Sequence, residues 1–342
     1  MPTDQMPEKT RSPMRRYAIF AIVTTIGLCT VWTAIWHYAR NVVASRIDTV
    51  LSANAHGRTA IFCTDRDISG FPFRMAISCS KAGLQEQTRN LSAQLHGIKV
   101  TALAYRPRHV IAEVTAPLNI SWSAPASPLN ADWSQGRASV SVGDLTLDRL
   151  SAEFDNLSIK TGPHAIAARH TEFHARSAGN ETPAETEQTD LAWSAGDATL
   201  AIQSETSAPF SIASTVRIDI PPAMLLTSGF GDRDIVVRDI DIRLIAAESR
   251  ITATGALTVD RSGTTNGAIV IDTENIPALA SFMQTLPSAI RAQAQTAIGA
   301  VIAMSKPVTN DKGSQVSRLD LTIRDSIIFA GSRQIGVLGP DS

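Results

Sequence analysis

The chain of 342 residues opens with one long apolar run and then changes to alternating apolar and polar positions. The run, YAIFAIVTTIGLCTVWTAIWHY at 17–38, contains no Lys, Arg, Asp or Glu. As a helix it would be roughly 33 Å long, which is enough to cross the hydrocarbon core of a bilayer. Trp32, Trp36 and Tyr38 gather at its far end, as aromatic residues do at membrane interfaces. We therefore expect a transmembrane helix rather than a buried helix of a soluble protein.

The charges beside this run indicate its orientation. The basic residues are Lys9, Arg11, Arg15 and Arg16 before the run and Arg40, Arg46 and Arg58 after it. Because the more basic flank stays in the cytoplasm, the tail at 1–16 is expected inside and the rest of the chain outside. A cleaved signal peptide is the alternative, but its apolar core is normally about 7–15 residues long. The run is therefore interpreted as an uncleaved signal anchor.

Beyond the anchor the spacing of the apolar positions changes twice. At 39–57 it is helical and predicts a stalk helix that ends at Gly57, with apolar positions at Val42, Val43, Ile47, Val50 and Leu51. From 58 to 342 the period is two, with turn residues between the runs. The clearest runs are 97–105, 137–142, 151–160, 164–175, 210–220, 234–246, 250–260, 267–272 and 318–330. This texture predicts a mainly β domain of antiparallel strands.

One helical block, at 275–306, interrupts the strands. Asn275 is a suitable N-cap, Pro277 fits the first turn, and Pro287 divides the block into two helices. The second, Ala-rich helix at 288–304 is expected to pack on a sheet or to cover an opening. Arg291 and the length of the block after Pro287 argue against a second membrane span.

Charge and cysteine content narrow the class of protein. Lys plus Arg number 31 and Asp plus Glu 32, so the net charge of −1 offers no basic face for nucleic acid. Of the cysteines, Cys29 lies in the anchor, while Cys63 and Cys79 lie 16 positions apart on either side of a GFP turn at 70–72. A hairpin would bring these two sulfur atoms together, and we predict a disulfide, which persists in oxidising compartments. Two unpaired buried thiols are the alternative.

No motif for catalysis or cofactor binding stands out. There is no nucleophile elbow, P-loop, dinucleotide fingerprint or C-x-x-C pair. One cluster consists of His164, His170, Glu172 and His174. On a strand an i,i+4 pair lies about 13 Å apart, too far to share a metal ion, so a solvated polar face is expected. Carboxylates alternate with apolar residues in the same way at Asp239, Asp241 and Asp260. The sequence thus predicts no catalytic, cofactor-binding or metal-ligating residue, and we do not expect an enzyme.

Several segments resemble DUF2125, a bacterial family of unknown function. They are the N-terminal span, Cys63, GFPFRMAISC at 70–79, AYRPRHVIAEVTAPL at 104–118 and LTIRDSIIFAGSRQIGVL at 321–338. The GFPFR turn followed by a cysteine is the most specific part of the resemblance. Asp325-Ser326 departs from the family pattern, which would have Asp-Gly there. The resemblance brings no established catalytic residue. It implies a single-pass protein of the bacterial inner membrane with its large domain in the periplasm.

A looser likeness connects ATGALTVDRSGTTNGAIVIDTENIPALASFM at 253–283 with the AsmA-like envelope proteins. Those proteins have a signal anchor and an elongated, curved β-sheet with an apolar groove, and they are implicated in lipid traffic and outer-membrane upkeep. The likeness implies elongated, curved antiparallel sheet here and phospholipid or fatty acid as a partner, by analogy of architecture. The alternative is a scaffold whose β-domain docks another envelope protein.

Two of the predicted strands carry the candidate residues for lipid contact. Alternate apolar side chains share one face of each strand, namely Ile212, Val216 and Ile218 at 210–220, and Ile251, Leu257 and Val259 at 250–260. Such one-sided strands must cover an apolar surface. That surface is either the core of a closed two-sheet sandwich or a partly open groove, with the helix at 288–304 as its lid.

Overall fold

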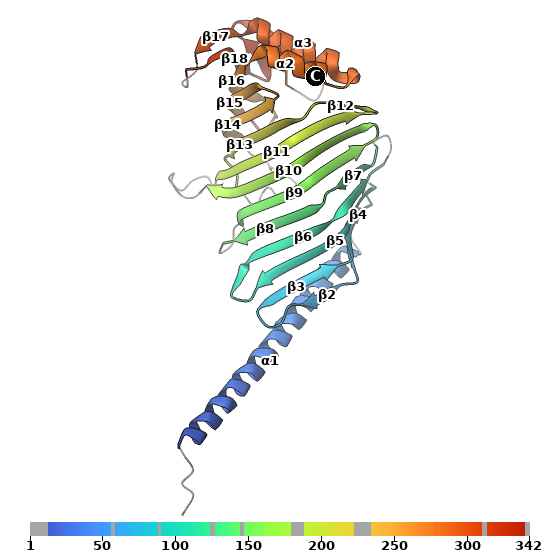
Figure 1. Cartoon of the computed structure of the whole chain (residues 1–342), viewed down its shortest axis with the longest axis vertical. Coiled ribbons are helices and arrows are strands. Elements are labelled where there is room, and N and C mark those ends of the chain that lie inside the picture. The colour runs from blue at the N-terminus through green and yellow to red at the C-terminus, as the bar shows by residue number, and fades with distance from the viewer. Residues whose placement is uncertain are drawn as a thin grey trace, which may run out of the picture.

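The computed structural model describes residues 13–55, 59–87, 90–123, 127–143, 147–178, 188–221, 234–309 and 313–338. Most of the predicted tail and the predicted helix stop at Gly57 lie outside the described residues. The described strands form one antiparallel sheet of 20 strands, which confirms the mainly β class. The sheet rises from the long helix α1 and carries α2 and α3 at its opposite end (Figure 1).

The helices are α1 (Pro13–Ala55), α2 (Ile276–Gln284) and α3 (Ser288–Met304). The first ten strands are β1 (Thr59–Thr64), β2 (Asp67–Ser69), β3 (Arg74–Cys79), β4 (Lys81–Glu86), β5 (Leu91–Leu103), β6 (Arg106–Ser121), β7 (Leu129–Asp132), β8 (Gln135–Val142), β9 (Leu147–Thr161) and β10 (His164–Ala178). The others are β11 (Gln188–Ile202), β12 (Glu205–Thr206), β13 (Phe210–Ile218), β14 (Ile235–Ala246), β15 (Ser249–Val259), β16 (Thr265–Glu274), β17 (Lys306–Thr309), β18 (Gln315–Arg324), β19 (Ile327–Ala330) and β20 (Arg333–Val337).

The strands follow one another across the sheet nearly in chain order. The central series is β3, β5, β6, β8, β9, β10, β11, β13, β14, β15, β16 and β18, each antiparallel to the next. At the anchor end β4 continues the edge beside β5, and β1 pairs with β4. At the other end β17 and β19 share the free edge of β18. The described strands form no second sheet, which excludes a two-sheet sandwich for this part of the chain.

The surface area reflects this single-layer architecture. The chain exposes 22544 Å². A compact globular protein of 36.5 kDa would expose about 13,500 Å². The protruding α1 and a sheet without a second layer both add to the difference. Trp193 and Ile242 are among the exposed apolar side chains of the sheet.

Anchor and stalk form one helix, α1, of 43 residues. It contains a stretch with a mean hydropathy of 2.0, long and apolar enough to cross a membrane. Val43, Ile47 and Leu51 are half-buried, whereas Val42 and Val50 of the predicted apolar side are exposed. The upper part of α1 packs against β1. An ion pair of 2.7 Å between Asp48 and Arg66 adds a further connection to the strands.

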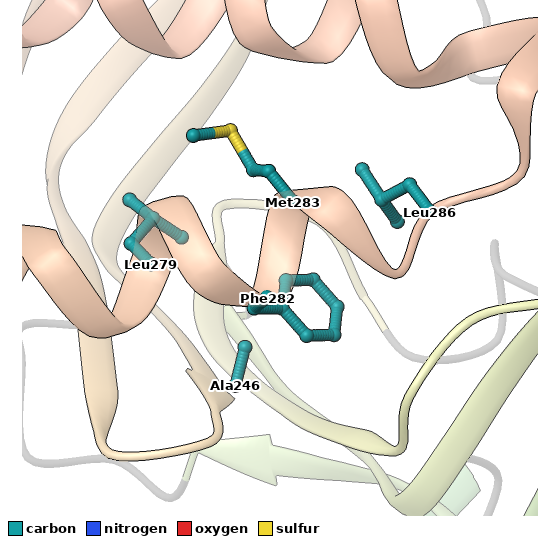
Figure 2. Packing of buried hydrophobic residues seen from close by; sticks show 5 residues of the cluster. All are labelled: Ala246, Leu279, Phe282, Met283 and Leu286. Carbon is teal, nitrogen blue, oxygen red and sulfur yellow. The ribbon is translucent and has the colours of Figure 1, made fainter.

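The helical block lies where the sequence predicts it. The Asn275 side chain accepts a hydrogen bond of 3.3 Å from the Ala278 N–H, and Pro287 directly precedes α3. Helix α2 packs its apolar side on the end of β14 and β15, where Leu279 is only 1% exposed. Figure 2 shows this cluster of buried side chains, which consists of Ala246, Leu279, Phe282, Met283 and Leu286.

The departure from the family pattern at Asp325-Ser326 lies in the hairpin turn between β18 and β19. Both residues have left-handed backbone angles, with φ of 49° and 65°. Glycine is favoured at such positions because it has no side chain to clash. Here the Ser326 hydroxyl accepts a hydrogen bond of 3.0 Å from the Thr265 N–H, a contact that glycine could not make. This bond offsets part of the conformational cost.

Candidate functional site

One face of the sheet carries apolar side chains along its whole length, and we call it the apolar face. The strand register aligns one residue from each strand of the central series into a single cross-strand row. The row is Ile77, Val100, Ala112, Ala138, Ala152, Phe173, Trp193, Ser214, Ile242, Ala253, Ile271 and Leu319. At a strand spacing of about 4.8 Å, this row extends for about 50 Å.

The structure places the six predicted lipid-contact residues on this apolar face. Ile212 and Ile251 are both paired with Leu244 of the strand between them. Ile218 and Leu257 are likewise both paired with Val237. Between Val237 and Ile240, β14 contains one extra residue relative to β15. This bulge keeps Val237 on the same face of the sheet as Leu244. Val216 and Val259 belong to the same face, since Val216 is paired with Leu191 and Val259 with Ile235.

Coverage of the apolar face is uneven. At the end beneath α2, Phe210 and Ile251 pack against the buried cluster, and the rings of Phe210 and Phe282 lie 6.0 Å apart. Farther along, Trp193 is 39% and Ile242 is 37% exposed. Helix α3 contacts α2 and β18, so the two helices cover the end of the face and not its middle. The predicted lid therefore lies at one end of the sheet.

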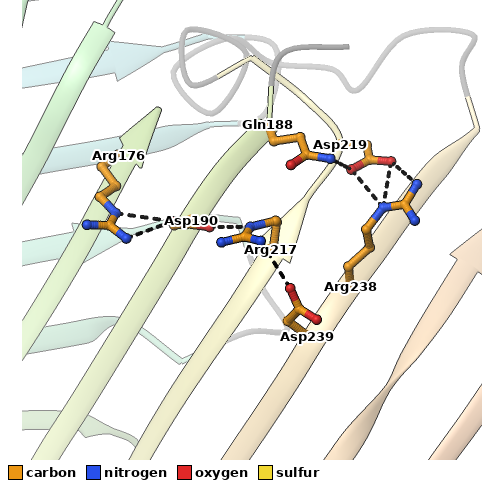
Figure 3. Close-up of polar contacts among 7 residues, drawn as sticks. All are labelled: Arg176, Gln188, Asp190, Arg217, Asp219, Arg238 and Asp239. Carbon is orange, nitrogen blue, oxygen red and sulfur yellow. Dashed lines mark hydrogen bonds and ion pairs between the residues drawn. The ribbon is translucent and has the colours of Figure 1, made fainter. Parts of the chain in front are cut away.

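The opposite face is polar, and cross-strand ion pairs organise it. Figure 3 shows one chain of them, in which the Asp190 carboxylate lies between Arg176 at 3.0 Å and Arg217 at 2.7 Å, and Arg217 continues to Asp239 at 3.2 Å. The hydrogen bond from Arg217 holds the pKa of Asp190 below its ordinary value, and Arg176 adds to the effect. A hollow of about 630 Å³ is lined by these charged side chains. Of the six candidate lipid-contact residues, Val216 alone contributes to its lining, beside Ala175 and Leu191.

Three members of the predicted histidine cluster, His170, Glu172 and His174, lie on the polar face. His164 does not share that face, because it pairs with Ile202, which the register shift between Ala195 and Ala198 places on the side of Phe210. His170 contacts Asp155 at 2.7 Å and Glu172 at 2.8 Å, and His174 contacts Glu172 at 3.3 Å. The hydrogen bond to Asp155 is the main reason why the pKa of His170 is raised, with Glu172 second. Within the described part of the chain, no group of three His, Cys, Asp or Glu side chains has the geometry of a metal site.

The scattered carboxylates that sequence reasoning left unassigned have local partners. Asp239 pairs with Arg217, and Asp241 pairs with Arg243 on its own strand. Asp260 accepts hydrogen bonds from the Ser262 and Thr264 N–H groups in the turn after β15. Those contacts, with the Ser262 hydroxyl as the largest contribution, lower the pKa of Asp260. Asp239 thus joins two neighbouring strands and Asp260 stabilises a turn, whereas Asp241 is neutralised within its own strand.

The predicted cysteine pair forms a disulfide in the structure. The sulfur atoms of Cys63 and Cys79 are 2.02 Å apart and the Cα atoms 5.4 Å apart. The bond joins β1 to the end of β3 at the anchor end of the sheet. Cys29 is free and exposed on the apolar part of α1.

Sequence reasoning missed most of the apolar face, which includes residues of β6 and β11 that no predicted run contained. Trp193 on β11 is the largest of them, and its neighbours Leu191 and Ala195 follow the period-two rule that could have revealed the strand.

Sequence reasoning also missed contacts of the GFPF turn with α1. The only signal for these contacts is that aromatic residues occur in both segments.

Comparison with known proteins identifies the family. The model of DUF2125, described as an uncharacterized protein conserved in bacteria, matches residues 36–338. The chain therefore belongs to the DUF2125 family. No curated protein and no solved structure gives a significant match to it.

Proposed function

We propose that this DUF2125 protein is a non-enzymatic, single-pass protein of the bacterial inner membrane whose periplasmic sheet binds and shields lipid acyl chains in envelope maintenance. The observation that carries this proposal is the apolar face, which continues across twelve strands without a second sheet over it in the described residues. Soluble surfaces seldom leave so large a contiguous apolar area without a binding partner.

The energy available on this face is sufficient to hold an acyl chain. Burying ten methylenes would contribute about 8 kcal/mol at roughly 0.8 kcal/mol each, before the cost of association. The small side chains of Ala138, Ala152 and Ala253 leave space between larger neighbours such as Phe173 and Trp193. Flexible chains can fill such an irregular surface, whereas a rigid ligand would need one shaped pocket.

Two features support the proposed orientation. The flank of α1 that precedes the apolar run is the more basic one, which favours a cytoplasmic N-terminus. The Cys63–Cys79 disulfide lies in the domain on the other flank, and disulfides persist in oxidising compartments such as the periplasm. Both arguments favour the same compartment for the sheet.

The proposal of a non-enzymatic role rests on the polar face. Its charged groups form ion pairs across the strands, as Asp190 does with two arginines, and this arrangement stabilises a sheet. Catalytic acid–base pairs, by contrast, are titratable groups whose environments push their pKa values apart. An apolar face with a salt-bridged back fits a binding surface better than a reaction site.

Lipid analysis of a detergent-free fragment tests this proposal. Residues 59–338, exported to the periplasm and purified without detergent, are expected to carry phospholipid or fatty acid detectable by mass spectrometry. The matched variants are Leu257→Asp on the apolar face and Thr258→Asp on the polar face. Only Leu257→Asp should remove the lipid. A folded fragment that is free of lipid would reject lipid binding and favour the scaffold alternative.

A further inference from the structure

The turn between β2 and β3 lies directly against the part of α1 that is apolar enough to span a membrane. The Trp32 indole N–H donates a hydrogen bond of 3.0 Å to the Pro72 carbonyl. Its ring lies 6.5 Å from that of Phe73, and the Trp36 ring lies 5.5 Å from that of Phe71. The Gly70 φ of 108° allows the tight turn that brings these side chains to the helix. The turn is therefore fixed at the level of Trp32 and Trp36.

The number of residues between Arg16 and the two tryptophans indicates how deep Trp32 and Trp36 lie in the bilayer. If Arg16 marks the near surface, Trp32 lies about 24 Å and Trp36 about 30 Å farther along the helix, at 1.5 Å per residue. The hydrocarbon core of a bilayer is about 30 Å thick, and any tilt of the helix moves both residues deeper. Phe71 and Phe73 therefore lie at the far boundary of the hydrocarbon core.

Exposure and charge at this end of the sheet fit a membrane surface. Phe71 is 51%, Phe73 64% and Tyr105 70% exposed. Tyr105 lies at the adjacent β5–β6 turn, where the Ala104 N–H donates a hydrogen bond of 2.8 Å to the Phe73 carbonyl. Arg74 and Arg106, next to these aromatic residues, are also exposed. Aromatic rings at the headgroup level with basic groups nearby are typical of segments that contact anionic bilayers.

We propose that Phe71, Phe73, Arg74, Tyr105 and Arg106 form a membrane-docking rim that inserts into the headgroup layer of the bilayer that α1 spans. The aromatic rings enter the acyl boundary and the two guanidinium groups meet lipid phosphates. The rim fixes the sheet against the membrane surface, which a single helix could not do alone.

Docking has a consequence for the apolar face, and this consequence rests on the proposed function. Phe73, Met75 and Ile77 alternate along the chain, and Met75 and Ile77 pair with residues of the apolar face on β5. The face therefore begins at the bilayer surface. An acyl chain could move from the far leaflet onto β3 and β5 without crossing water.

Depth measurement on the full chain tests the rim. In a Cys29→Ser background, the unreduced protein would be spin-labelled at Phe73→Cys or at Tyr105→Cys. It would be reconstituted in nanodiscs of phosphatidylethanolamine and phosphatidylglycerol. Both labels should relax faster with oxygen than with a water-soluble nickel chelate. Thr258→Cys, at an exposed position on the polar face of β15, is the control and should show the reverse. Labels at 73 and 105 that are as accessible to nickel as the label at 258 would overturn the proposal.

This readout is independent of whether the sheet carries lipid. If the labels at 73 and 105 lie within the bilayer while fragment 59–338 is free of lipid, docking is supported and the proposed function is rejected. If the labels are accessible to water while the fragment carries lipid, docking is rejected and the proposed function stands.

Discussion

Replacing Cys63 and Cys79 together by serine tests how the anchor end of the sheet is held. The two cysteines belong to β1 and β3, which are not hydrogen-bonded to each other, because β1 pairs with β4 whereas β3 pairs with β2 and β5. Without the disulfide, β1 is held by its pairing with β4, by its packing on α1 and by the Ser80 N–H, which donates a hydrogen bond of 2.9 Å to the Thr64 carbonyl. The double replacement also avoids leaving one reactive thiol behind.

The expected cost follows from the loop that the bond closes. The two cysteines are separated by 16 positions. In the chain-entropy account a loop of that size corresponds to about 3 kcal/mol at 25 °C, through the freedom that the unfolded chain regains. If β1 to β3 open separately from the rest of the sheet, the loss appears first as faster amide exchange in these strands.

The assay is urea unfolding of the full chain in detergent micelles, followed by tryptophan fluorescence. Trp133 is a suitable reporter because it is 8% exposed and packs edge-on against Phe154. Cys29→Ser is the matched control and should leave the unfolding free energy unchanged within about 0.5 kcal/mol. The reasoning fails if the double variant unfolds like the unmodified chain, or if maleimide labels Cys63 and Cys79 in the native, unreduced protein.

Three further predictions concern the two faces and the helical end. Leu257→Asp should lower the lipid content of the fragment 59–338 while Thr258→Asp retains it, as measured by mass spectrometry. NMR titration should give His170 a pKa above 6.5, and Glu172→Gln should lower it. Since this folded-state pKa is raised, the contribution of His170 to stability is complete below pH ~6.5 and is lost as the pH rises through the raised value. Leu279→Ala should destabilise the chain by about 3–5 kcal/mol in denaturant unfolding. The reason is that the Leu279 side chain is almost fully buried between α3 and the ends of β14 and β15. A cost below about 1 kcal/mol would contradict this packing.

Local sequence patterns determined much of the architecture. Period-two alternation located β9, β10, β13, β14 and β15 because each has one apolar and one polar face. Asn275, Pro277 and Pro287 located α2 and α3 because capping and proline effects act within a single turn. The run at 318–330, however, is two strands, β18 and β19, because left-handed Asp325 and Ser326 form a turn inside it.

What the sequence could not provide depends on partners distant in the chain. Alternation is the same in a closed sandwich and in a single sheet, so it could not show that Phe173, Trp193 and Ile242 lie in one uncovered row. That arrangement follows from the register of each strand pair, including the shift near Val237. The contact between Trp32 and Pro72 likewise joins segments 40 residues apart, and no local pattern encodes it.

Photo-crosslinking in living cells tests the central claim most directly. The photoreactive amino acid p-benzoylphenylalanine would replace Trp193 or Ile242 on the apolar face, and Ser194 or Arg243 on the polar face as matched controls. Cells would be grown with radioactive phosphate so that bound phospholipid is visible on the purified protein. The account predicts labelled adducts at 193 and 242 and none at 194 and 243. Absence of lipid adducts at 193 and 242, or equal labelling at all four positions, would contradict it.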